Sequence, residues 1–215
     1  MKQVPAGTKV DIDPETGAMK RLSGETRTNP YDLFALEAAL QLREKVGGSV
    51  TVLTMGPPQA DVALREALAM GCDDAYLLSA REFGGSDTCA TAIIISTALK
   101  KIGYDLVITG RQAIDGDTAQ VGPQLAEKLD LPQVSYVEEF EIADDRKSVT
   151  VKRQLEDGYE LIEVALPCLL TTIKELNTPR YMTISGIYGA KEMKTWNAKD
   201  IEVDLTKVGL EASPT

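Results

Sequence analysis

Residues 49–78 read SVTVLTMGPPQADVALREALAMGCDDAYLL, and this stretch indicates the fold class. It opens with an apolar run over 49–55, typical of a buried strand, which a loop with two prolines ends. A helix over about 59–70 and a second strand over 75–78 follow. A strand, a helix and a strand in this order are typical of a parallel sheet with crossover helices.

The same alternation extends in both directions from this unit. Asn29 and Pro30 predict the start of a helix, because Asn is a common N-cap and Pro suits the first turn, and Gly47 predicts its end. The other expected elements are a hairpin over 8–12 and 18–21 with its turn at 13–17, helices over 88–102 and 118–129, a strand over 105–109, and β segments over 134–142, 148–155, 159–165 and 168–173.

We therefore predict an α/β fold with a doubly wound, mainly parallel sheet, an additional β-rich segment and an extended C-terminal arm. One domain would cover 1–190, with the β-rich segment at 134–173, and the arm would cover 191–215. A doubly wound sheet normally begins with a buried strand, whereas this chain begins with the loop-like Lys2-Gln3-Val4-Pro5. We therefore expect a further strand to precede it.

Composition excludes several functional classes. The chain has 215 residues, of which 43% are hydrophobic, and 23 Lys and Arg against 33 Asp and Glu give a net charge of -10, which disfavours nucleic acid as a partner. Histidine is absent, which excludes Ser-His-Asp and Cys-His triads and HExxH zinc sites.

The cysteines and the apolar runs indicate the cellular compartment of the protein. The 3 cysteines are widely spaced, which predicts reduced structural thiols. The longest nearly apolar run, 90–99, is about half of the ~20 residues that cross a bilayer. With no secretory signal at the N-terminus, we predict a cytoplasmic protein that does not insert into membranes.

The loop over 110–122 is the strongest candidate site, because ligands of open α/β sheets bind where the strands end. It follows a strand and enters a helix, so it presents free backbone amides that attract phosphate. A well-capped helix after a polar loop is the alternative, since Asp115 and Asp117 would ordinarily repel an anion. Neither GxGxxG nor GxxxxGK[ST] occurs, which disfavours ordinary Rossmann binding and P-loop hydrolysis.

Four further residues remain open between a structural and a binding role. Met55, at a strand end, could lie against a flat ring or belong to the core. Asp87 and Thr88 could contact a ligand or begin a helix. Leu176 lies in a segment with little regular pattern, where an apolar side chain either tucks into its own domain or meets a partner.

Four segments in the same order resemble the β subunit of electron-transfer flavoprotein over nearly the whole chain, about 1–215. They are NPYDLFALEAAL at 29–40, ALREALAMGCDDAYLLS at 63–79, GRQAIDGDTAQVGPQLAE at 110–127 and LNTPRYMTI at 176–184. The resemblance implies a fold similar to the adenine-nucleotide-binding hydrolases. It also implies a heterodimer with an α subunit that holds an electron-carrying FAD.

The resemblance allows two different nucleotides to be bound by this chain. Ordinary members bind a structural AMP, whereas the bifurcating, FixA-like branch binds a second FAD that accepts hydride from NADH and splits the two electrons. The run DGDTAQVG at 115–122 is similar to the second branch, since AMP-binding relatives tend to carry another acid and a Cys-Asn pair there. We therefore expect FAD, with AMP as the alternative. An ATP-using enzyme of similar fold would need a loop richer in glycine.

Matching positions then assign roles to individual residues. The resemblance places the diphosphate on the amides near 116–121, where strong repulsion is relieved if the acidic side chains point outward, and Arg111 near the phosphates or the reduced ring. Leu176 matches the leucine of the family's recognition loop, expected here at about 174–184, that docks onto an acyl-CoA dehydrogenase or another redox partner. No catalytic or metal-ligating residue is expected. The candidate cofactor contacts are Asn29, Pro30, Tyr31, Asp32, Met55, Arg111, Gln112, Ala113, Ile114, Asp115, Gly116, Asp117, Thr118, Ala119, Gln120, Val121 and Gly122, joined by Asp87 and Thr88 for an FAD.

Overall fold

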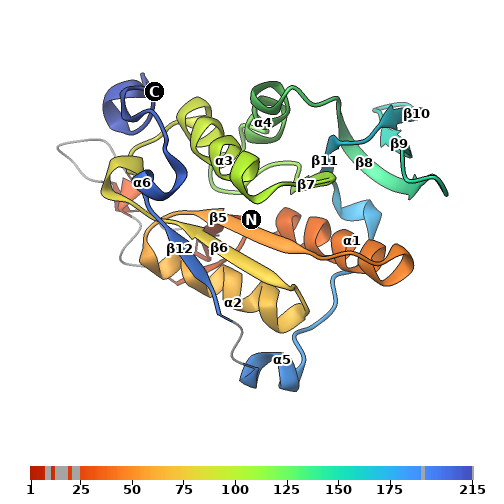
Figure 1. The fold of residues 1–215 in the computed structure, drawn as a ribbon, viewed down its shortest axis with the longest axis horizontal. Coiled ribbons are helices and arrows are strands. Elements are labelled where there is room, and N and C mark those ends of the chain that lie inside the picture. The colour runs from red at the N-terminus through yellow and green to blue at the C-terminus, as the bar shows by residue number, and fades with distance from the viewer. Residues whose placement is uncertain (8–10, 13–18, 21–24, 190–191, 215) are drawn as a thin grey trace.

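The fold is built on the predicted strand-helix-strand unit (Figure 1). The computed structural model describes residues 1–7, 11–12, 19–20, 25–189 and 192–214. Strands β5 (Thr51–Met55) and β6 (Asp74–Leu78) are parallel, with α2 (Asp61–Met70) between them in the chain. β12 (Lys194–Trp196) pairs in parallel with the other edge of β6, which completes a sheet of order β12-β6-β5.

A second sheet has the order β10-β9-β8-β11-β7. Its strands are β7 (Leu106–Gly110), β8 (Gln133–Ile142), β9 (Ser148–Gln154), β10 (Tyr159–Ala165) and β11 (Cys168–Thr172). β11 runs parallel to β7 and β8, while β9 and β10 continue the sheet as an antiparallel meander. The predicted mainly parallel α/β fold with its β-rich segment is confirmed.

Helices cover both faces of the first sheet. The remaining helices are α1 (Pro30–Val46), α3 (Thr88–Ile102), α4 (Val121–Leu129) and the short α5 (Ile184–Tyr188) and α6 (Ala198–Ile201). In Figure 1, α2 lies on one side of the β12-β6-β5 sheet and α3 on the other. α1 packs on the α2 side and also contacts β7, so it joins the two sheets.

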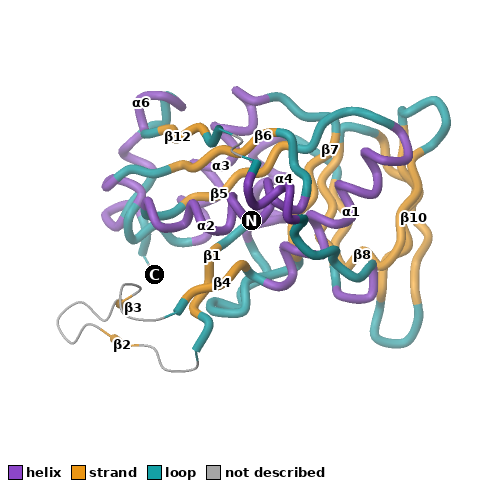
Figure 2. Tube along the Cα trace, turned by 90° about the horizontal axis from the view of Figure 1, so that it is seen from below, coloured by secondary structure: helices purple, strands orange, loops and turns teal. Residues whose placement is uncertain are grey.

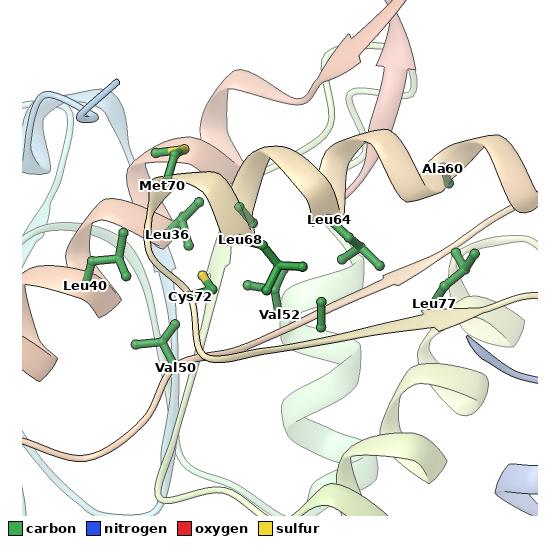
Figure 3. Close-up of a cluster of buried hydrophobic side chains, with 12 residues drawn as sticks. Leu36, Leu40, Val50, Val52, Ala60, Leu64, Leu68, Met70, Cys72 and Leu77 are labelled. Atoms are coloured by element: carbon green, nitrogen blue, oxygen red, sulfur yellow. The ribbon is translucent and has the colours of Figure 1, made fainter. Parts of the chain in front are cut away.

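The core on the α2 side is formed by apolar residues from α1, α2 and β5. Leu36 and Leu40 of α1, Leu64 of α2 and Val52 of β5 meet in one cluster (Figure 3). Leu40 and Leu64 are fully buried, and burying such a side chain stabilises the fold by about 1.5–3 kcal/mol. On the opposite face, Leu78 packs against α3 in a separate cluster. The strands are therefore apolar on both faces, as a buried parallel sheet requires.

The N-terminal segment lies beside this body (Figure 2). β1 (Gln3–Pro5) and β4 (Thr26–Thr28) are antiparallel, and so are β2 (Asp11–Ile12) and β3 (Met19–Lys20). The pairing of β2 with β3 is consistent with the predicted hairpin, whose turn at 13–17 lies outside the described residues. β5 and β7 are edge strands of their sheets. The expected preceding strand stays a prediction.

The C-terminal residues are more regular than the sequence pattern suggested. β12 adds a strand to the first sheet, and α6 packs against α3. Only 3 residues of β12 pair with β6, too few for an alternating pattern to be recognised. The division of the chain at residue 190 stays a prediction, which limited proteolysis would test. No helix in the described part of the chain is long and apolar enough to cross a membrane.

Candidate functional site

Asn29 connects the start of α1 with the loop that follows β7. Its side chain is buried, and Nδ2 donates to the carbonyl oxygen of Gln112 at 2.8 Å, while Oδ1 accepts from the amide of Ile114 at 3.2 Å. The predicted N-cap bond is absent, because the side chain points to this loop instead of the first turn of α1. Asn29 therefore fixes the position of the first half of the 111–122 loop.

Asp32, in the first turn of α1, makes a second connection. Its carboxylate accepts from the backbone amide of Lys2 at 2.7 Å and from that of Gly110 at 3.1 Å. A Cβ at residue 110 would lie 2.6 Å from the backbone carbon of Tyr31, so only glycine allows this approach. β7 thus ends directly against the N-terminus of α1, where Pro30 occupies the first position of the helix.

The two acidic residues of the loop are both engaged. Asp115 forms an ion pair with Lys2, with 2.6 Å between Oδ1 and Nζ, and its side chain is only 7% exposed. Asp117 accepts a hydrogen bond from the side-chain amide of Gln112. Asp115 therefore does not meet the condition that the acids point outward; its charge is buried and is compensated by Lys2. Repulsion of an anion by this loop is correspondingly reduced.

Backbone amides are available at the far end of the loop. α4 begins at Val121, later than the predicted Thr118, because Asp117 and Ala119 adopt left-handed φ angles of 54° and 53° that a helix does not allow. Within the described part of the chain, no acceptor is found for the amides of residues 118–122. Together with the dipole of α4, these donors favour an anion.

The start of α3 reaches the same loop. Thr88 Oγ1 lies 2.8 Å from Oε1 of Gln120, the residue that precedes α4. Asp87 caps α3, accepting from the amide of Ala90 at 2.9 Å, which confirms its predicted capping role. Met55 packs at the edge of the α3 core cluster. Among the described residues no hydrogen bond or ring contact joins Met55 to the 111–122 loop.

Arg111 lies between two aromatic rings. Its guanidinium carbon is 5.2 Å from the ring centre of Tyr31 and 5.3 Å from that of Tyr136, and Nε donates to Gln112 Oε1 at 2.9 Å. Sequence reasoning missed Tyr136, since nothing in the alternation of 134–142 distinguishes it. Tyr136 is distinguished by its backbone, which has a left-handed φ of 61° that only the structure shows.

Leu176 lies elsewhere, near the C-terminal half of α1. It is half-buried and lines a cavity of about 320 Å³ with Leu42, Phe140 and other residues of α1 and β8. The segment after it is attached to α1 through Arg180, which forms ion pairs with Glu37 at 2.8 Å and Glu44 at 2.5 Å. The structure therefore separates the candidate nucleotide site from the candidate partner site.

Exposed apolar side chains follow this attachment, and two of them lie within the expected recognition loop at about 174–184. Tyr181, Ile184 and Tyr188 are 94%, 76% and 84% exposed. The sequence signal was the unusual density of large apolar residues in 181–188, which has no core-forming period. Such a cluster is typical of interaction surfaces.

Comparisons with known proteins agree with this architecture. The family model described as electron transfer flavoprotein domain matches residues 16–204. The electron transfer flavoprotein subunit beta of Thermoanaerobacterium thermosaccharolyticum is 58% identical over 100% of this chain and 83% of its own length. The caffeyl-CoA reductase-Etf complex subunit CarD of Acetobacterium woodii is 56% identical over 100% and 82%, and protein FixA of Sinorhizobium fredii is 46% identical over 100% and 79%.

Proposed function

Because this chain belongs to the electron transfer flavoprotein family, as a β subunit, we propose that it binds FAD at the ends of its parallel strands. It forms a heterodimer with an FAD-containing α subunit in the cytoplasm. The complex passes electrons between NADH or dehydrogenases and acceptor proteins, with flavin-based electron bifurcation. The names of two relatives, one a subunit of a caffeyl-CoA reductase complex and one an electron transfer subunit of acryloyl-CoA reductase, support a redox complex with an acyl-CoA partner.

One observation carries the proposed nucleotide site: hydrogen bonds tie the 111–122 loop to α1 and α3, while among the described residues its last amides have no acceptor. Asn29 fixes its first half and Thr88 contacts its end. A loop tied at both ends loses little entropy when an anion binds to its amides, which favours affinity. The diphosphate of FAD fits amides at a helix N-terminus.

The residues of this loop also leave space for an anionic ligand. No atom lies within 4 Å of the position that a Cβ of Gly116 would take, so the loop is open at this point. The ion pair of Asp115 with Lys2 removes one source of repulsion. FAD supplies the electron-carrying chemistry when bound. The chain contributes amides for the phosphates and the Arg111 cation, which favours an anionic form of a nearby group.

The nucleotide content of the purified heterodimer tests the proposal. Both subunits are co-expressed, the complex is denatured, and the released nucleotides are separated by chromatography. Two FAD per heterodimer support the proposed function. One FAD and one AMP would make this subunit a scaffold that does not accept electrons, and FAD binding here would be refuted.

Gly116 offers a matched pair of variants for the phosphate site. Gly116→Asp adds a negative charge beside the unpaired amides and should lower FAD occupancy, while Gly116→Ala adds only a methyl group in open space and should leave it unchanged. Neither variant requires a left-handed residue, because Gly116 has no positive φ. Full FAD occupancy in Gly116→Asp would contradict the placement of the diphosphate.

A further inference from the structure

We propose that Tyr136 is a positioning residue of the nucleotide site, which acts by keeping the Arg111 guanidinium oriented toward the bound nucleotide. This inference rests on the proposed function, because it assigns a ligand to Arg111. Tyr136 belongs to β8, on the far side of β11 from the end of β7, so sequence proximity does not suggest the pair.

The contacts of Arg111 leave only one part of its side chain free. The rings of Tyr31 and Tyr136 both lie near the guanidinium, at 5.2 Å and 5.3 Å from its carbon, distances typical of cation–π contacts. Nε is used by Gln112. Among the described residues, the two terminal nitrogens donate to no acceptor, and no carboxylate lies within 4.0 Å. Those nitrogens can therefore donate to an anionic oxygen of a ligand.

The backbone of Tyr136 supports a specific role for its ring. A φ of 61° is unusual for a bulky residue, because this conformation costs tyrosine more energy than it costs glycine or asparagine. The residue lies where β8 loses regular register with β11, and its amide lies 3.3 Å from Thr171 Oγ1. Tyr136 is 37% exposed, so burial in a core does not explain an aromatic residue here. Its contact with Arg111 does.

Backbone and side-chain contacts connect this pair to the candidate nucleotide loop. Arg111 follows Gly110, the residue packed against α1, and its amide donates to the Thr172 carbonyl at 2.9 Å. Gln112 connects it onward to Asp117 of the loop with unpaired amides. A bound nucleotide that contacts these amides and the free edge of Arg111 would meet one connected set of donors.

A double-mutant cycle on the heterodimer tests this role. The complex is freed of nucleotides, and the dissociation constant of added FAD is measured for wild type, Tyr136→Asn, Arg111→Gln and the double variant. Asn tolerates the left-handed conformation, so Tyr136→Asn removes the ring without adding backbone strain. Tyr136→Phe keeps the ring. Tyr159→Asn, on β10, removes a ring that contacts Lys152 of β9 and is the matched control.

We expect Tyr136→Asn to weaken FAD binding at this site about three- to tenfold, as the loss of one cation–π contact implies. Tyr136→Phe and Tyr159→Asn should bind as wild type does. In the Arg111→Gln background, Tyr136→Asn should have less than about a twofold effect, because the ring acts through the cation.

An equal effect of Tyr136→Asn in both backgrounds would overturn the proposal, and so would unchanged binding in Tyr136→Asn or weakened binding in Tyr136→Phe. The α-subunit FAD serves as an internal reference, since none of these variants should alter it. If the wild-type complex takes up AMP and no second FAD, this result refutes FAD binding at this site but not the role of Tyr136. The same cycle measured with AMP then decides the role of Tyr136 by the same criteria.

Discussion

Replacing Arg180 by alanine should destabilise the protein, because it removes the cation that compensates Glu37. The Glu37 side chain is 4% exposed, and its carboxylate accepts from Arg180 Nε at 2.8 Å and from a terminal nitrogen at 3.0 Å. Breaking a fully buried ion pair costs about 3–5 kcal/mol. The Arg180 side chain is 30% exposed, and the backbone amide of residue 180 and Gln41 still donate in the variant. We therefore expect a loss of about 2 kcal/mol.

The dependence of this loss on pH identifies its source. Burial alone would raise the pKa of Glu37, but hydrogen bonds from Arg180 and Gln41 lower it below its ordinary value of 4.5. A carboxyl with a lowered pKa in the folded state stabilises the protein above its ordinary pKa and loses this contribution as pH falls through the folded pKa. The difference between wild type and Arg180→Ala should thus be largest near neutral pH and shrink toward pH 4 and below.

Urea unfolding of the purified protein at a series of pH values measures this difference. Arg180→Lys should lose less than Arg180→Ala, because it keeps the charge but not the bidentate geometry. Glu44→Gln is the matched control: it removes the exposed partner of Arg180 and should have little effect. A loss in Arg180→Ala that is the same at pH 7 and pH 4, or that is absent, would refute the reasoning.

Three further predictions concern the site, the thiols and the partner surface. Gly110→Ala should lower the free energy of unfolding by about 2–3 kcal/mol, since its Cβ would overlap the backbone of α1; unfolding by urea measures this. In the folded protein a maleimide should modify the exposed Cys89 but not the buried Cys168, whose pKa burial raises to about 11; mass spectrometry of peptides decides. Leu176→Ala should slow electron transfer to a partner dehydrogenase at unchanged flavin content, whereas the control Leu161→Ala on β10 should not slow it. Loss of flavin in Leu176→Ala would show that the loop has a structural role.

The β5-α2-β6 unit was predictable because the signals that define it are local. An apolar strand that is buried on both faces leaves its pattern in a few consecutive residues, and so does a helix that ends at a glycine. The start of α4 was placed too early for a related reason. The left-handed residues Asp117 and Ala119 interrupt the helix, and neither is a glycine or proline that would have marked the interruption.

The family, the alternation of strands and helices, and the loop that carries the candidate site could all be recognised from the residues alone. The tertiary structure decided which side chains support that loop: Asn29 turned out to connect two segments, Lys2 to compensate Asp115 from 113 positions away, and Tyr136 to contact Arg111. Periodicity reports which face of an element is apolar, whereas the order of strands in a sheet determines which distant residues meet. Contacts of this kind depend on that order and leave no pattern in a single chain.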